Sequence, residues 1–146
     1  MNGTGLDVFD TTIQKTHVWL NDLMSELEWE GEPRLAYLGL RTVLHALRDR
    51  LTIEEAVQLG AQLPMLIRGF YYDGWKLTRK PVKERHKEEF LGHVKKAFKD
   101  DVTIDPERVA RAVFKVLARR TSAGEIQDVK HLLPKGVREL WPKEKV

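Results

Sequence analysis

The chain of 146 residues contains no cysteine, and this absence excludes disulfides, thiolate nucleophiles and cysteine-ligated zinc. Ten glycines and six prolines are too few for a low-complexity chain. The longest apolar run, residues 59–67, is interrupted by Gln62 and Pro64 and is much shorter than the roughly 20 residues that span a bilayer. Residues 1–10 lack the basic and apolar regions of a signal peptide. We therefore expect a cytoplasmic, soluble protein without a membrane segment.

The charges that are present are unevenly distributed. Residues 1–73 contain 6 Lys/Arg and 11 Asp/Glu and carry a net charge of −5, whereas residues 74–146 contain 19 and 11 and carry +8. Opposite charges of this size attract the two halves to each other, to a second copy or to different partners. The sequence therefore leaves open whether the protein forms a homo-oligomer.

Apolar residues recur at spacings of three and four along almost the whole chain, which is the pattern of amphipathic helices. Asp10 is the predicted N-cap of the first helix, and Pro33 opens the second. Thr52 and Glu55 form a predicted capping box, in which each side chain bonds the backbone N–H of the other residue. Pro64 restarts the helix, and no stretch alternates with period two for long enough to form a strand. The sequence predicts an all-α fold, a compact helical bundle.

The second half of the chain repeats the first. A shift of 70 positions aligns helix residues, helix caps and the signature Leu-Pro-x-x-x-Arg. The aligned pairs are Arg41 and Arg111, Val43 and Val113, Leu47 and Leu117, Arg50 and Arg120, Thr52 and Ser122, Glu55 and Glu125, Leu63 and Leu133, Pro64 and Pro134, and Arg68 and Arg138. The first helices of the two halves align at a shift of 71. This pattern predicts an internal duplication.

The duplication sets the expected domain organisation. We predict a first unit at residues 1–73, a basic linker at 74–82 and a second unit at 83–146, each unit with about four helices and the two related by an approximate twofold axis. Because a unit of about 70 residues buries little core, the two should pack as one cooperative domain.

Several segments resemble a known family. They are residues 9–16 (Phe-Asp-Thr-Thr-Ile-Gln-Lys-Thr), 44–51 (Leu-His-Ala-Leu-Arg-Asp-Arg-Leu), 59–72 (Leu-Gly-Ala-Gln-Leu-Pro-Met-Leu-Ile-Arg-Gly-Phe-Tyr-Tyr) and 122–126 (Ser-Ala-Gly-Glu-Ile), followed by Leu132-Leu133-Pro134 and Trp141. Over nearly its whole length the chain resembles the bacterial family called domain of unknown function 2267. The resemblance implies a helical bundle. It implies no activity, cofactor or catalytic residue, because the family has none assigned.

Five residues are candidates for binding a partner or ligand. The two arginines of the repeated signature, Arg68 and Arg138, could bind an anion together, since guanidinium geometry suits carboxylate or phosphate. The alternative is that each arginine satisfies a carbonyl or carboxylate group within its own unit. The first signature ends in more aromatic residues than the second: Tyr71, Tyr72 and Trp75. They form either an exposed contact surface or the packing between the two units.

Lys76, Arg79, Lys80 and Lys83 are candidates for contacting nucleic acid, because they follow the aromatic residues closely and cations neutralise phosphates. Three glutamates between residues 84 and 89 dilute this charge, and no helix-turn-helix turn is evident. The sequence therefore disfavours nucleic acid as the partner.

His86, Glu89 and His93 lie at i, i+3 and i+7 on one helical face, a spacing compatible with a carboxylate–histidine metal site. One helix supplies three ligands at most, and the two histidines border the apolar stripe of that helix. We therefore expect no metal and no cofactor.

Enzyme signatures are missing as well: the sequence has no phosphate-binding glycine loop, no nucleophile elbow and no His-Glu-x-x-His. The leading hypothesis is a non-catalytic helical interaction module that binds a protein or a small ligand. One alternative is a nucleic-acid-binding protein that uses the basic linker. The other is an unrecognised enzyme with a site between the two repeats.

Overall fold

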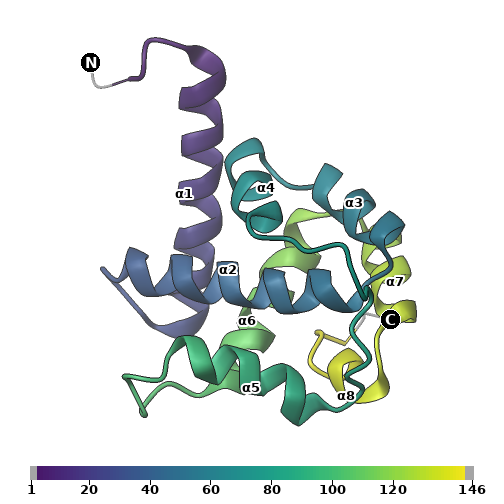
Figure 1. Ribbon diagram of the computed structural model, residues 1–146. Coiled ribbons are helices and arrows are strands. Elements are labelled where there is room, and N and C mark those ends of the chain that lie inside the picture. The colour runs from purple at the N-terminus through teal and green to yellow at the C-terminus, as the bar shows by residue number, and fades with distance from the viewer. Residues whose placement is uncertain (1–2, 144–146) are drawn as a thin grey trace.

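The computed structural model describes residues 3–143, in which the chain forms eight α-helices and no strand (Figure 1). The helices are α1 (Asp7–Leu27), α2 (Pro33–Arg50), α3 (Ile53–Ala61), α4 (Met65–Tyr72), α5 (Lys87–Ala97), α6 (Pro106–Arg120), α7 (Ala123–Leu132) and α8 (Lys135–Arg138). The predicted all-α helical bundle is confirmed. Within residues 3–143, no helix combines the length and the apolar character needed to cross a membrane.

Most helices begin where the sequence predicts. Pro33 is the first residue of α2, where its missing N–H leaves no unpaired donor. The side chains of Thr52 and Ser122 cap α3 and α7, because their hydroxyl oxygens accept the backbone N–H groups of Glu55 (3.1 Å) and Glu125 (3.2 Å). The prediction that both residues cap helices is confirmed.

Two capping predictions are wrong. Helix α1 starts at Asp7 instead of after Asp10, and the Asp10 carboxylate accepts the N–H of Thr4 (2.7 Å) from within the first turn. The predicted capping box of α3 is only half formed in the part of the chain that the structure describes. The hydroxyl of Thr52 accepts its bond, but the Glu55 carboxylate does not return one to the Thr52 N–H.

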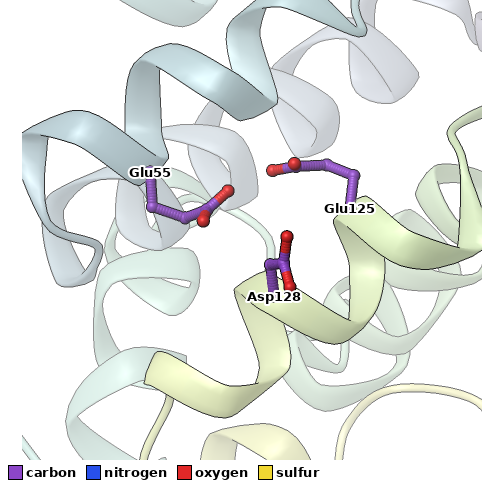
Figure 2. Close-up of side chains that lie close together, drawn as sticks. All are labelled: Glu55, Glu125 and Asp128. Atoms are coloured by element: carbon purple, nitrogen blue, oxygen red, sulfur yellow. The ribbon is translucent and has the colours of Figure 1, made fainter.

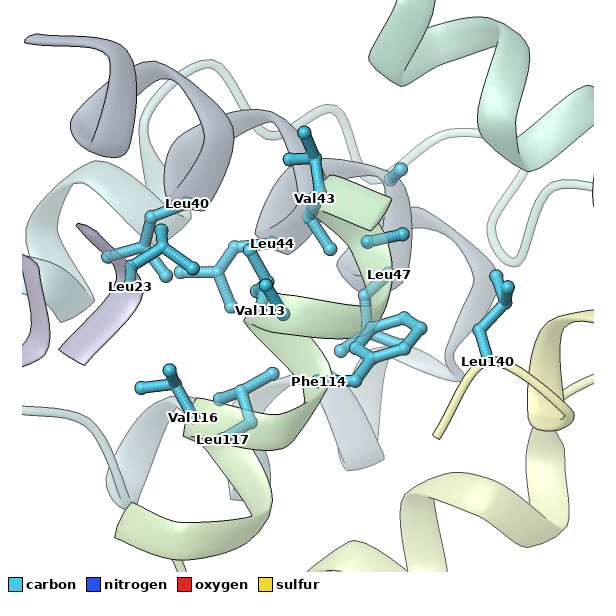
Figure 3. Packing of buried hydrophobic residues seen from close by; sticks show 14 of the residues in the cluster. Leu23, Leu40, Val43, Leu44, Leu47, Val113, Phe114, Val116, Leu117 and Leu140 are labelled. Carbon is cyan, nitrogen blue, oxygen red and sulfur yellow. The ribbon is translucent and has the colours of Figure 1, made fainter. Parts of the chain in front are cut away.

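Helix α2 crosses the centre of the bundle and contacts α1, α4, α5 and α6 (Figure 1). Its apolar face interleaves with that of α6, with Leu44 and Leu47 beside Val113 and Phe114 (Figure 3). These four side chains are fully buried, and each such burial contributes about 1.5–3 kcal/mol. Since α2 belongs to the first half and α6 to the second, the two halves share one hydrophobic core.

Ion pairs between α1 and α6 also join the acidic half to the basic half. Glu26 of α1 pairs with Lys115 (3.0 Å) and Arg119 (2.9 Å) of α6, and Asp22 pairs with Arg120 (2.8 Å). Burial alone would raise the pKa of Glu26, but hydrogen bonds from Arg119 and Lys115 outweigh it and lower the pKa. Partly exposed pairs contribute little each, so they orient the halves while the core supplies most of the stability.

The two halves use their signature arginines in the same way. Arg68 donates from Nε to the carbonyl of Gly60 (3.0 Å) and from Nη2 to that of Leu63 (2.9 Å). Arg138 makes the same two bonds to the carbonyls 70 positions further on, at 3.1 and 2.9 Å. The local environments therefore agree with the predicted duplication, while the twofold relation between whole units stays a prediction.

Removing either hydroxyl cap should destabilise the protein to a similar extent. We expect Thr52→Ala and Ser122→Ala each to lower the free energy of unfolding by about 1 kcal/mol, because each leaves a first-turn N–H without its acceptor. Urea denaturation measures the effect. Thr11→Ala on the exposed side of α1 is the control, with an expected change below about 0.5 kcal/mol. If only one of the two substitutions lowered the free energy of unfolding, the two hydroxyl caps would not be equivalent.

Candidate functional site

The linker between α4 and α5, residues 73–86 in the structure, is fixed to the bundle at two points. The backbone N–H of Val82 donates to the carbonyl of Asp49 at the end of α2 (2.8 Å). The carboxylate of Glu84 pairs with the guanidinium of Arg50, which is 4% exposed and lies 5.1 Å from the Phe90 ring. These contacts hold residues 79–85 close to the C-terminal end of α2, so this segment is part of the folded structure and not a free spacer.

A cleft of about 770 Å³ lies along this pinned segment. Linker residues line it, together with Leu132 at the end of α7 and Pro134 in the turn before α8. The volume falls in the range of small-molecule sites, which is about 300–1,000 Å³. The cleft therefore brings together residues that are far apart in the sequence, from α2, the linker and the second half.

The charge of the cleft is strongly positive. Arg79, Lys80, Lys83 and Arg85 line it, and none of them forms an ion pair or a side-chain hydrogen bond within residues 3–143. The single acidic residue in the lining, Glu84, is already engaged by Arg50 and by the ring of His93 (3.0 Å). Four uncompensated cations around one cleft attract an anion.

Arg50 lines this cleft and carries a buried donor without a partner in the described structure. Its Nη1 donates to the carbonyl of Ala46 (2.8 Å), whereas its Nε–H has no hydrogen-bond partner in the part of the chain that the structure describes. Burial lowers the pKa of Arg50, and the Glu84 carboxylate opposes this change. An unpaired buried donor is costly, so an oxygen-bearing ligand that reached it would be favoured.

The backbone of the linker is strained at one cation. Arg79 has a φ of 59°, in the left-handed region that side chains other than glycine seldom adopt. A backbone conformation of this kind costs about 1–3 kcal/mol and persists only where surrounding contacts stabilise it. Such conformations are frequent at binding sites.

Three of the four residues considered for nucleic acid therefore meet at the cleft. Arg79, Lys80 and Lys83 line it, whereas Lys76 is exposed outside it. Sequence reasoning missed the contribution of Arg50. The spacing of apolar residues along α2 does not indicate that an arginine on its buried face contacts the linker.

Of the two alternatives for the aromatic residues, the exposed contact surface does not fit Tyr71. Tyr71 is fully buried, and its hydroxyl donates to the carbonyl of Ala56 (2.6 Å), so it is excluded as a contact residue. Tyr72 and Trp75 are half-buried and stack on each other, with ring centroids 5.5 Å apart and an angle of 24°. The short turn at Pro64 folds α4 back against α3, and this packing covers the aromatic side chains within the first half.

Arg68 and Arg138 adopt the structural role that the sequence left as an alternative. Both direct two donors to carbonyl groups near the C-terminal ends of α3 and α7. Arg68 also lines a groove of about 890 Å³ against the projecting N-terminal part of α1, where Phe9 and Ile13 are exposed (Figure 1).

His86, Glu89 and His93 do not assemble a metal site within residues 3–143. The Glu89 carboxylate accepts the backbone N–H of His86 (3.1 Å) at the start of α5, and the His93 ring contacts Glu84 (3.0 Å). Both side chains are thus used in local contacts that their helical spacing does not reveal.

Comparison with known proteins gives a family. The model of a family described as "Uncharacterized conserved protein (DUF2267)" matches residues 16–140, which is most of the chain. No curated protein matches it.

Proposed function

The chain belongs to the DUF2267 family, and we propose that it is a non-catalytic helical module that binds an anionic small molecule in the cleft along its linker. The single observation that carries this proposal is the set of four cations without ion-pair partners in the described structure: Arg79, Lys80, Lys83 and Arg85. Charge-assisted hydrogen bonds to a phosphate or carboxylate group would satisfy them.

The apolar part of the lining supports a small molecule. Leu132 is 43% exposed and lines the same cleft as the basic residues, so a ligand with an apolar portion beside its anionic group would cover it. Single-stranded nucleic acid would need free aromatic faces near the cations. Trp75 stacks on Tyr72 instead, and this arrangement favours the small ligand over the nucleic-acid alternative.

The test is a titration with inorganic pyrophosphate, which carries the proposed anionic chemistry without a base. We expect Lys83→Ala combined with Arg85→Ala to weaken binding at least about tenfold, because two charge-assisted contacts are lost. The matched control is Lys95→Ala combined with Lys96→Ala, which removes the same charge from the exposed last turn of α5. We expect this control to change binding less than about twofold.

Three results would contradict the proposal. They are no binding of pyrophosphate at low salt, an equal loss in both double variants, and preferential binding of a single-stranded oligonucleotide. The last result, with an affinity that falls steeply with salt, would support the nucleic-acid alternative.

A further inference from the structure

Three carboxylates meet where the two halves join at α3 and α7. Figure 2 shows Glu55 of α3 and Glu125 of α7 pointing toward each other, with Asp128 beside them on α7. One carboxylate oxygen from each residue lies within 4.8 Å of the other two. Glu55 and Glu125 are only 9% and 8% exposed, whereas Asp128 is open to solvent.

Each of the two buried carboxylates has one oxygen atom without a hydrogen-bond partner in the described structure. Oε2 of Glu55 and Oε2 of Glu125 are buried without a hydrogen bond in the described structure, and no lysine or arginine there forms an ion pair with either residue. Buried polar groups are nearly always satisfied, and buried charges are paired or coordinate a metal. The arrangement therefore lacks a positive charge.

Local helix chemistry does not explain why the two glutamates face each other. Each is the third residue of its helix, the position from which a glutamate usually reaches back to the N-cap N–H. Glu55 and Glu125 leave that bond unmade although Thr52 and Ser122 make theirs. Burial, together with the facing carboxyl of Glu55, raises the pKa of Glu125 to about 8. The side chains are thus held in an unfavourable arrangement that a proton or a cation would relieve.

We propose that Glu55, Glu125 and Asp128 bind one divalent cation of the size of Ca²⁺ between α3 and α7. Carboxylate oxygens are the ligands that Ca²⁺ and Mn²⁺ prefer, and the set contains no nitrogen or sulfur. The three oxygens lie within 4.8 Å of one another, close enough for one ion with a Ca–O distance of about 2.4 Å to contact all of them. The exposed side of Asp128 leaves room for water ligands.

The cation would connect the two halves directly, because Glu55 lies in the first half and the other two ligands in the second. This role is independent of the basic cleft, whose lining includes none of the three residues. The observations favour a small ion over an organic substrate at this position, because the carboxylates approach one another too closely to admit a larger group.

The experiment is calorimetric titration of the chelator-treated full-length protein with CaCl₂, and separately with MnCl₂. We expect one ion per chain and at least about tenfold weaker binding for Glu55→Gln and for Glu125→Gln, since each loses a charged ligand. Glu54→Gln is the matched control, with the same charge change one residue away on the exposed face of α3. It should bind within about twofold of the unmodified protein.

Mn²⁺ also reports where it binds, because it broadens nearby backbone amide resonances. We expect the broadening to begin around residues 55, 125 and 128 and to disappear in Glu125→Gln. No binding at millimolar cation, unchanged binding in both glutamine variants, or broadening centred elsewhere would overturn the proposal. In the first of these outcomes the carboxylates would share a proton instead. Circular dichroism of each variant verifies that it is folded.

Discussion

Phe114→Ala is expected to lower the free energy of unfolding of the whole protein by about 3–5 kcal/mol, the cost of a large cavity in a packed core. The Phe114 ring is fully buried and stacks on Trp141, with centroids 4.1 Å apart and an angle of 4°. It also lies 5.7 Å from Phe90 and beside Leu47 of α2 (Figure 3). It therefore contacts both halves, and we expect the substitution to destabilise both of them.

Urea denaturation followed by two probes measures this effect. Far-UV circular dichroism reports the helices of both halves. Tryptophan fluorescence reports Trp19 and Trp29 in the first half, Trp75 in the linker and Trp141 in the second half. We expect the two curves to coincide and to shift together in Phe114→Ala, as for one cooperative domain. Val102→Ala, at a residue that is 95% exposed, should leave the curves in place. Two separate transitions, with only one shifted by the substitution, would show that the halves unfold independently.

The helices were predictable from sequence because their signals are local. The spacing of apolar residues, Pro33 at a first turn and the hydroxyls of Thr52 and Ser122 all act within one or two turns of the chain. The start of α1 was misplaced because Asp10 acts from inside the first turn, through a bond to Thr4 that a capping rule does not include.

The candidate sites were predictable only in part, because they depend on contacts between distant segments. The basic linker was visible as a run of cations, but its cleft requires Arg50 and the turn before α8. Whether the aromatic cluster is exposed or packed stayed open, because the sequence does not reveal that α4 folds back onto α3 and buries Tyr71. The repeat placed Glu55 and Glu125 at matching positions, yet their meeting depends on how α3 packs against α7.

The carboxylate pair is expected to make the cation-free protein less stable as the pH rises. The folded-state pKa of Glu125 is raised from 4.5 to about 8, so the folded chain binds more protons than the unfolded chain between these values. The free energy of unfolding therefore falls as pH increases through this window and levels off above about pH 8. We expect Glu125→Gln to remove this fall, because an amide carries no charge and can donate a hydrogen bond to Glu55.

At pH 9 without divalent cation, Glu125→Gln should thus be more stable than the unmodified protein by roughly 3–5 kcal/mol, whereas at pH 5 the two should differ by less than about 1 kcal/mol. Urea denaturation at both pH values in the presence of a chelator measures the difference in unfolding free energy between the two proteins. Groups that titrate alike in both proteins do not contribute to this difference. Glu54→Gln should show no such dependence, since its side chain is exposed. A glutamine variant that is less stable at pH 9 would mean that the facing carboxylates are compensated by a contact within the chain. A glutamine variant that is more stable at pH 9 and no longer binds the cation would instead show that the facing carboxylates destabilise the fold. Loss of stability in favour of binding is typical of a binding site.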